Sequence, residues 1–477
     1  MLACVLIALA FISCDCGKNP AIQVILTNKG LQSGRHVAAG WIQEKLDHVT
    51  LPDISGEIRV GFLLHIGYKL TGITIIKSDF PEPSVEFYQG FSGLKTSIEG
   101  LNVALTGSWE AHCGFVHGGG SFDMALFGVD VVSIVQLGRD AGGRLSLTSV
   151  NCNAQLGDLN THFYGNRSWL LCLVEGHFKK NLRGQIENMI CPAVDELIAN
   201  LESHLKDMRV NFQVNQDLTL DLPLIGPPVV SASSLQLGLK GQFYSVKCPK
   251  EPPFVAMPFA TPEQPAYMLS VGLSDFTVNS ASFSYFSADL LQAFINDSMI
   301  PPSSPVRLNT TSLGPFIPQL PKMFPDLLMT LQIYATNFPV FSFRSGAVVL
   351  SSSGAVKAFA IQRNATLTPL FKLHVDSGFT GKVWVADGRL KGSVTMDNFT
   401  LSLEATEIGP FKTDALENMT QTLIERTILP QLNEKLATGF ALPHTKHAQL
   451  VNPVLTVEEG FVAFNSDAML LEDTIFN

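Results

Sequence analysis

Two long amphipathic segments, at residues 178–205 and 413–436, set the strongest constraint on how this chain folds. Their apolar residues recur at steps of three to five, the spacing of a stripe along one face of an α-helix. The stripes comprise Leu182, Ile186, Met189, Val194, Leu197, Leu201 and Leu205 in the first segment, and Leu416, Met419, Leu423, Ile424, Ile428, Leu432 and Leu436 in the second. Each segment follows short alternating or apolar stretches, at residues 54–156 and 327–403, that are typical of antiparallel strands.

The two halves of the chain therefore repeat one order of elements. A shorter helix is predicted before each strand region, at residues 30–47, where Val37, Trp41 and Leu46 share a face, and at residues 285–295. Pro192 should kink the first long helix or remove one of its internal hydrogen bonds, Pro430 should kink the second, and Gly439 suits the end of the second. This order predicts an α+β fold with two elongated barrels, each a twisted antiparallel sheet packed on a long helix.

A proline-rich stretch at residues 246–265 separates the halves. Its six prolines are Pro249, Pro252, Pro253, Pro258, Pro262 and Pro265. Proline fixes φ and lacks a backbone donor, which excludes a helix or a central strand and favours an extended linker. The predicted domains are a signal peptide at 1–17, an N-terminal barrel at 18–245, the linker, and a C-terminal barrel at 266–477.

The composition indicates surplus apolar surface. Apolar residues make up 46% of the chain and charged residues only 16%, against about 25% charged in ordinary soluble domains. The net charge is −10, and neither half carries the positive charge that a nucleic-acid partner requires. Apolar surface beyond the needs of a core is available for a lipid or a membrane.

The beginning of the chain and its sequons indicate secretion. Residues 1–13 are apolar and are followed by small residues, as in a cleaved signal peptide. A membrane anchor is the alternative, but a span requires about 20 apolar residues. Six Asn-X-Ser/Thr sequons predict glycosylation at Asn166, Asn296, Asn309, Asn364, Asn398 and Asn418. We expect an extracellular glycoprotein.

The cysteines leave a pairing question open. Cys4, Cys14 and Cys16 lie in or beside the signal segment, and five cysteines remain, so at least one thiol is free or pairs outside the chain. Cys152 ends the strand region and Cys191 lies on the first long helix. They form either a disulfide that joins helix to sheet or two buried thiols.

Catalytic motifs are absent from the sequence. It contains no Gly-X-Ser-X-Gly, His-Glu-X-X-His, P-loop or Cys-X-X-Cys pattern. His112, Cys113 and His117 are spaced closely enough for a soft metal, but an exposed hairpin explains them better, with the glycines at 118–120 in its turn. We therefore predict no enzyme, metal or cofactor. Trp109 and Phe115 flank this hairpin, either as an exposed aromatic tip or as core residues.

The C-terminal region carries a resemblance to a known family. Residues 430–443 read Pro-Gln-Leu-Asn-Glu-Lys-Leu-Ala-Thr-Gly-Phe-Ala-Leu-Pro, and residues 459–467 read Glu-Gly-Phe-Val-Ala-Phe-Asn-Ser-Asp. With Asn-Pro-Ala-Ile-Gln-Val at 19–24 and Leu-Pro-Asp-Ile-Ser-Gly at 51–56, this order of motifs resembles the family of bactericidal permeability-increasing protein and lipopolysaccharide-binding protein (the lipid-binding serum glycoproteins). The resemblance extends over residues 19–467.

This resemblance implies a boomerang of two barrels joined by a central sheet, with apolar tunnels for acyl chains. It also implies that Cys152 and Cys191 pair, and that Ile186, Met189, Leu197 and Leu201 line a lipid pocket. A lipopolysaccharide-binding tip would contain Arg59, His65, Trp109, Phe115 and His117. The sequence departs from the family here, because residues 107–117 include no lysine or arginine and Glu110 has the wrong sign for binding phosphate.

The predicted function is secreted binding of phospholipid or lipopolysaccharide in innate defence against Gram-negative bacteria. The alternative is a protein that transfers phospholipid between lipoproteins or membranes, which the weakly basic tip favours. The expected partners are phospholipid, lipopolysaccharide and a membrane or lipoprotein surface, without nucleic acid.

Overall fold

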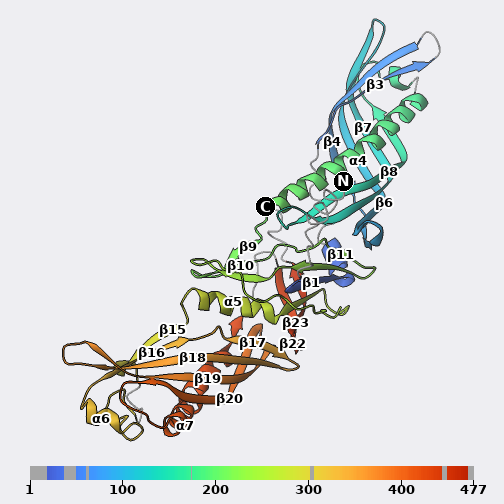
Figure 1. Cartoon of the computed structure of the whole chain (residues 1–477). Coiled ribbons are helices and arrows are strands. Elements are labelled where there is room, and N and C mark those ends of the chain that lie inside the picture. Colours follow the sequence, from blue (N-terminus) through green and yellow to red (C-terminus); the bar gives the residue numbers. More distant parts are fainter. Residues whose placement is uncertain are drawn as a thin grey trace, which may run out of the picture.

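The structure, a computed structural model, describes residues 19–36, 50–60, 64–172, 175–300, 306–442 and 448–470. The chain is elongated, with a curled antiparallel sheet and a long helix at each end and further sheets between them (Figure 1). The predicted α+β class is confirmed. The predicted signal peptide lies outside the described residues. The helix predicted at 30–47 is present at residues 28–36, and the positions of Val37, Trp41 and Leu46 lie outside the described residues.

The N-terminal sheet has seven antiparallel strands. Their order is β2-β4-β6-β7-β8, with β3 paired to β4 and β5 paired to β6. The strands are β2 (Thr50–Leu51), β3 (Ile54–Val60), β4 (Leu64–Asp79), β5 (Ser84–Tyr88), β6 (Gly93–Cys113), β7 (Val116–Arg139) and β8 (Leu145–Phe163), with a 3-10 turn η1 (Gln89–Phe91). Two helices follow, α3 (Trp169–Cys172) and α4 (Glu175–Asp207). The predicted meander and first long helix are confirmed; together these elements form the N-terminal unit.

The core of the N-terminal unit lies between its sheet and α4. Phe178, Leu182 and Ile186 of the helix are buried together with residues of β3, β4, β6, β7 and β8. The ring of Phe178 makes edge contacts with Tyr68 and Phe163, at centroid distances of 5.0 and 5.3 Å. Pro192 lies inside the continuous helix, where it removes one backbone donor as expected.

The centre of the molecule contains two smaller sheets. The six-stranded sheet has the order β11-β12-β1-β14-β23-β22, and the three-stranded sheet has the order β13-β10-β9. The strands are β1 (Ile22–Thr27), β9 (Asn211–Gln213), β10 (Leu218–Asp221), β11 (Val229–Val230), β12 (Ser234–Leu239), β13 (Gln242–Ser245), β14 (Leu269–Ser274), β22 (Ala448–Glu458) and β23 (Phe461–Leu470). The beginning and the end of the described chain thus meet in one sheet, on either side of β14.

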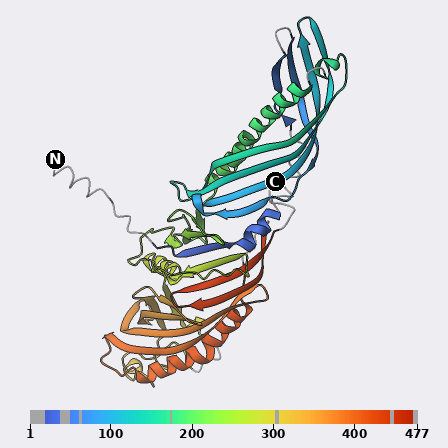
Figure 2. The same ribbon diagram turned by 90° about the vertical axis from the view of Figure 1, so that its right-hand side faces the viewer.

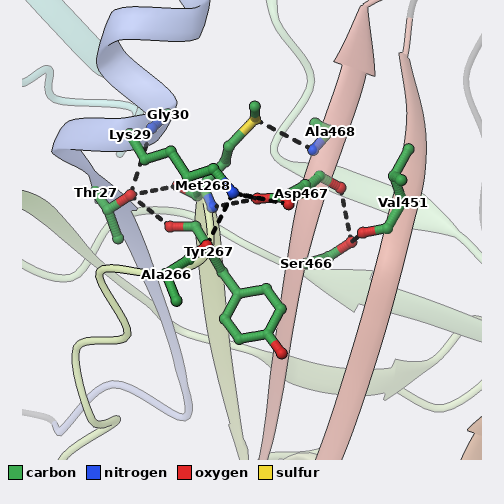
Figure 3. A network of polar contacts seen from close by, with 10 residues as sticks. All are labelled: Thr27, Lys29, Gly30, Ala266, Tyr267, Met268, Val451, Ser466, Asp467 and Ala468. Carbon is green, nitrogen blue, oxygen red and sulfur yellow. Dashed lines mark hydrogen bonds and ion pairs between the residues drawn. The ribbon is translucent and has the colours of Figure 1, made fainter.

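Polar contacts reinforce this meeting of the chain ends (Figure 3). The Lys29 ammonium lies 2.8 Å from an Asp467 carboxylate oxygen, and the same carboxylate accepts a hydrogen bond from the backbone N–H of Met268 at 3.1 Å. Thr27 donates to the Tyr267 carbonyl at 2.6 Å. These bonds join the end of β1 and the helix after it, the residues directly before β14, and β23.

The proline-rich stretch at residues 246–265 contains neither helix nor strand, as predicted. It is held along the first strand rather than left free. The Gln23 amide donates to the Phe259 carbonyl at 2.7 Å and accepts from the Thr261 N–H at 2.9 Å. Phe254 packs against Phe276 and Phe338, with centroid distances of 5.6 and 5.3 Å.

The prediction of a helix at residues 285–295 is wrong. The helix is α5 (Asp275–Ser287), and Gln292–Asn296 form strand β15. The backbone turns at Asp289, where φ is 56°, and β15 pairs with β16. The inner face of α5 is polar: Ser284 donates to the Phe243 carbonyl at 3.1 Å and Ser282 to the Pro339 carbonyl at 2.6 Å. Because these residues give no apolar stripe, hydrophobic periodicity could not locate the helix.

The C-terminal unit repeats the plan of the N-terminal one. Its sheet has the order β15-β16-β18-β19-β20-β21, with β17 paired to β18. The elements are β15, η2 (Asp297–Met299), α6 (Gln319–Met323), β16 (Met329–Ala335), β17 (Val340–Arg344), β18 (Ala347–Ile361), β19 (Leu367–Ala386), β20 (Arg389–Thr406), α7 (Asp414–Leu423), η3 (Ile424–Ile428), α8 (Leu429–Thr438) and β21 (Phe440–Ala441).

The second long helix is confirmed, in three consecutive segments. The five-residue π-helical segment η3 separates α7 from α8, directly before Pro430. Proline cannot donate to the preceding turn, and the wider π turn is found where that bond is missing. Gly439, with φ 73°, ends α8 as predicted. The helix lies along the C-terminal sheet (Figure 2), and Leu416 is buried in the core between them.

Candidate functional site

The long helix α4 covers the edge of the N-terminal sheet. Strand β8 ends the strand order, so its outward N–H groups need partners from outside the sheet. The Glu187 and Glu202 carboxylates accept hydrogen bonds from the backbone N–H groups of Leu156 and Leu147, at 3.0 and 2.5 Å. The Asp195 carboxylate accepts from the Ser149 hydroxyl at 2.6 Å. Hydrogen bonds to charged groups stabilise a fold by about 1.5–3 kcal/mol each.

The disulfide lies on the same side of the helix. Cys191 is four residues from both Glu187 and Asp195, a spacing that places all three on one helical face. It is bonded to Cys152 of β8, with an S–S distance of 2.05 Å and a Cα–Cα distance of 5.6 Å. The predicted pairing is confirmed. The other described cysteines, Cys113, Cys172 and Cys248, are free thiols.

The apolar stripe of α4 changes character along its length. Ile186 is buried and Met189 is partly buried against the core. Leu197 and Leu201, however, are 58% and 48% exposed. Val194 is the last residue of the stripe that packs against this core, and beyond it Ile198 is buried while its neighbour Leu197 is exposed. Of the four residues predicted to line a pocket, two are in the core and two form an open apolar surface.

This open surface lies at the inner end of the N-terminal unit. α4 runs from the distal end of the unit to the central sheets (Figure 1). Exposed apolar side chains continue beyond its last turn at Met208, Phe212 and Val214. Leu197 and Leu201 lie on α4, Phe212 on β9, and Met208 and Val214 in the loops beside β9. Grouped exposed apolar residues mark a binding surface more often than single ones do. We name Leu197, Leu201, Met208, Phe212 and Val214 the α4 apolar surface.

The second long helix has a similar exposed region. Leu416 and Leu429 are buried, whereas Leu423, Ile428 and Leu432 are exposed, Leu432 by 42%. We name Leu423 of α7, Ile428 of η3 and Leu432 of α8 together the α8 apolar surface. Each unit therefore presents apolar side chains on the helix that closes its sheet.

The structure also has two cavities, each lined by both polar and apolar residues. One of about 590 Å³ is lined by Asn28, Gln32, Glu86, Phe87, Tyr88, Gln89, Gly90 and Ala232. One of about 220 Å³ is lined by Phe286, Asp289, Leu291, Gln292, Gln332, Tyr334, Ala335 and Lys357. Neither includes residues of the α4 or the α8 apolar surface.

The tip of the N-terminal unit is the β6–β7 hairpin. Its turn is at Gly114 and Phe115, and the Phe115 side chain is fully exposed. Trp109 is only 1% exposed, and its indole N–H donates to the Tyr164 carbonyl at 2.9 Å. The prediction that Trp109 belongs to the lipopolysaccharide-binding tip is therefore wrong, because its ring is buried in the core and its indole N–H is hydrogen-bonded there.

The glycines at 118–120 do not form the turn that the sequence suggested. They lie in β7, against residues 164–166. A Cβ at Gly120 would meet the Tyr164 carbonyl oxygen at 1.9 Å, and one at Gly118 would meet the Asn166 carbonyl oxygen at 2.9 Å. Glycine is required here because the backbone crosses so closely. Among the described residues no group of three or more side chains could hold a metal ion, and the His112 and His117 rings lie 6.2 Å apart.

The predicted tip cations are paired with an acid that the sequence analysis overlooked. Glu57 lies 2.8 Å from the Arg59 guanidinium and 3.3 Å from the His65 imidazole. The hydrogen bond from Arg59, followed by that from His65, holds the pKa of Glu57 below its usual value. Glu57 and Arg59 are two residues apart on one strand, hence on the same face, and this spacing could have revealed the pair.

Comparison with known proteins identifies the family. Residues 30–202 match the N-terminal domain of the LBP / BPI / CETP family, and residues 212–470 match its C-terminal domain. The chain belongs to this family. The expectation drawn from the C-terminal motifs is confirmed.

Relatives in the LBP / BPI / CETP family align along nearly the whole chain. Bactericidal permeability-increasing protein of Sebastes schlegelii is 34% identical over 468 residues, covering 98% of this chain and 99% of its own. Human lipopolysaccharide-binding protein is 26% identical over 456 residues, covering 95% of each chain. A crystal structure of lipopolysaccharide-binding protein superposes with a TM-score of 0.57 at 25% identity, covering 95% of this chain and 99% of that one.

The sequons of this family member lie at varied positions. Asn166, Asn296, Asn364, Asn398 and Asn418 are exposed. Asn309 is partly buried, and its amide oxygen accepts the Ser312 N–H at 2.7 Å. In the described ranges, no helix is long and apolar enough to span a membrane.

Proposed function

We propose that this protein is a secreted, non-enzymatic lipid-binding protein acting in innate defence against Gram-negative bacteria. It takes up the acyl chains of phospholipid or lipopolysaccharide in an apolar tunnel between each long helix and its sheet. The observation that carries this proposal is the α4 apolar surface, with Leu197 and Leu201 exposed directly beyond the buried core. Covering apolar surface contributes about 0.8 kcal/mol for each CH₂ removed from water. Membership of a family whose members include lipopolysaccharide-binding protein supports this class of ligand.

The test introduces a charge into the α4 apolar surface. Leu197 is exposed, so Leu197→Arg should fold, yet it should lose lipid because a guanidinium would have to enter an apolar site. Ser203→Arg, at an exposed polar position on the same helix, is the matched control. Lipid bound to the secreted proteins is identified and counted by native mass spectrometry. Full lipid content in a folded Leu197→Arg protein would rule out α4 as a wall of the site.

The side chains at the tip favour binding of some lipids over others. Phe115 is available to enter a lipid interface, while Glu57 compensates Arg59 and His65. The Glu57 carboxylate has a lowered pKa, so it stays ionised, and the pairing holds, until the pH falls below the ordinary glutamate range. We infer weak, weakly salt-dependent lipopolysaccharide binding at pH 7.4. We expect binding to strengthen towards pH 5.5, where histidine in general carries more positive charge than at pH 7.4.

Glu57→Gln tests this preference, because it releases Arg59 at neutral pH. We expect tighter lipopolysaccharide binding with a steeper salt dependence, and unchanged binding to zwitterionic phospholipid, by calorimetry. Glu110→Gln removes an equal charge from β6, which is separated from β3 by β4, and should have a smaller effect. Tight, steeply salt-dependent binding by the unmodified protein at pH 7.4 would place the binding charge elsewhere.

A second function, transfer of phospholipid between membranes or lipoproteins, is favoured by the same pairing of the tip cations. Because Glu57 compensates Arg59 and His65, the tip attracts anionic lipid less strongly, and the protein can approach and leave a zwitterionic surface readily. Exchange of fluorescent phosphatidylcholine between vesicles measures this activity. Exchange of many phospholipid molecules by each protein molecule, together with negligible lipopolysaccharide binding, would favour transfer over defence.

A further inference from the structure

The N-terminal unit carries its one predicted glycosylation site beside the tip. The other five sequons begin at Asn296 or later. Asn166 forms an isolated antiparallel bridge with Gly119 of β7, with N–O distances of 3.0 and 3.2 Å in the two directions. The next residue, Arg167, donates from its guanidinium to the His117 carbonyl at 2.8 Å. The Asn166 side chain is exposed at this position.

The hairpin geometry sets the distance between this sequon and the leading residue of the tip. Gly119 follows Phe115 by four positions, and the chain from Val116 onward is extended in β7. At about 3.3 Å per residue, Asn166 lies on the order of 13 Å behind Phe115 along the hairpin. Close packing of Gly118 and Gly120 against residues 164–166 holds the sequon at this level.

We propose that a glycan on Asn166 limits how deeply the tip enters a lipid layer. Residues that insert at an interface typically reach about 5–10 Å below the headgroup boundary. Phe115 can reach that depth while the glycan remains in water. Deeper entry would carry sugar hydroxyls into hydrocarbon, where a hydroxyl without a hydrogen-bond partner is strongly disfavoured. The glycan thus keeps contact with the lipid layer shallow and reversible.

This inference rests on the lipid-binding tip of the proposed function, so the experiment separates the two. Full-length protein is secreted from a glycosylating host, and occupancy of Asn166 is read by glycopeptide mass spectrometry. The maximum insertion pressure into phosphatidylcholine monolayers is then measured for the unmodified protein, Asn166→Gln and Asn364→Gln. Asn364 is the matched control, exposed at the turn between β18 and β19 of the other unit.

We expect Asn166→Gln to insert at higher surface pressure than the unmodified protein. Asn364→Gln should insert at the same pressure as the unmodified protein. Ser168→Ala, which removes the sequon but keeps Asn166, should match Asn166→Gln. Phe115→Ser should lower insertion in both glycosylated and unglycosylated proteins. An unoccupied Asn166, or unchanged insertion of Asn166→Gln while Phe115→Ser lowers it, overturns the depth limit alone. If Phe115→Ser inserts as well as the unmodified protein, the proposal of a lipid-binding tip is itself wrong.

Discussion

The N-terminal and C-terminal units satisfy the same requirement with different side chains. In the N-terminal unit, carboxylates of Glu187 and Glu202 accept the free N–H groups of edge strand β8. In the C-terminal unit, Glu417 accepts the Leu401 N–H of β20 at 2.7 Å. Asn433 both accepts from the Val394 N–H and donates to the Val394 carbonyl, at 2.8 and 3.0 Å. A single amide thus completes a pair of strand-like bonds.

The difference lies in what fixes the helix to the strand. Cys152 and Cys191 join α4 to β8 covalently, whereas the sequence has no cysteine after Cys248. The C-terminal helix instead contains the π-helical segment η3 and is held by hydrogen bonds and packing. Both long helices therefore provide partners for backbone groups of the strand beside them, and the disulfide is an addition in the N-terminal unit.

The largest expected effect is loss of the disulfide. The double variant Cys152→Ala, Cys191→Ala should lower the free energy of unfolding of the N-terminal unit by about 2–5 kcal/mol, because the unfolded chain is no longer cross-linked. Native-state hydrogen exchange should show α4 amides opening more readily, with α7 and α8 unchanged. Equal loss of protection in both units would mean that they unfold as one, and the comparison between them would fail.

Removing Asn433 should have the next largest effect. Asn433→Leu leaves the N–H and the carbonyl of Val394 without their partners, at a cost of about 1–3 kcal/mol in the C-terminal unit. Glu434→Leu, at the neighbouring exposed position, serves as the control. Chemical denaturation followed by a probe in each unit measures both. A neutral result for Asn433→Leu would show that packing alone holds this helix.

Neutralising the equivalent glutamates compares the two edge contacts directly. Glu187→Gln and Glu417→Gln retain an acceptor but lose the charge, and each should cost about 1 kcal/mol, given that charged hydrogen bonds are roughly twice as strong as neutral ones. The denaturation midpoint of each unit is the measurement. A cost confined to Glu417→Gln would indicate that the disulfide already supplies what Glu187 adds.

The smallest stability change is expected at the exposed leucines. Leu197→Arg and Leu432→Arg should each alter stability by no more than about 0.5 kcal/mol, since surface substitutions rarely do more. If each unit holds its own lipid, each variant should lose one lipid and keep the other, as counted by native mass spectrometry. Loss of both lipids from either variant would point to a single shared site.

Hydrophobic periodicity sufficed for the elements whose burial is apolar. The strand regions, α4 and the second long helix were all predictable because their stripes are made of aliphatic residues. α5 was not, because most of its buried residues are polar; Ser280 and Ser284 among them bond to a backbone N–H and a carbonyl that no local pattern reveals. The resemblance to a family supplied the pairing of Cys152 with Cys191, which spacing had left open.

The candidate site was less predictable because burial depends on distant partners. Trp109 and Phe115 are six residues apart on one hairpin, yet one ring is enclosed and the other fully exposed. The difference arises from residues 163–165, which supply Phe163 and the Tyr164 carbonyl against Trp109 but leave the turn uncovered. Likewise, the α4 stripe continues to Leu201, but the core beneath it does not.

The placement of β1 and β23 on either side of β14 has a consequence for biogenesis. β14 pairs along its full length with β23, which comprises residues 461–470. A chain emerging from the ribosome can join β1 to β12 and β14, but β14 keeps an open edge until residues 461–470 have been synthesised. An open edge readily pairs with other chains. Synthesis that stops before residue 461 should therefore yield chains with two formed units and an open strand edge at the centre, which are candidates for retention by chaperones.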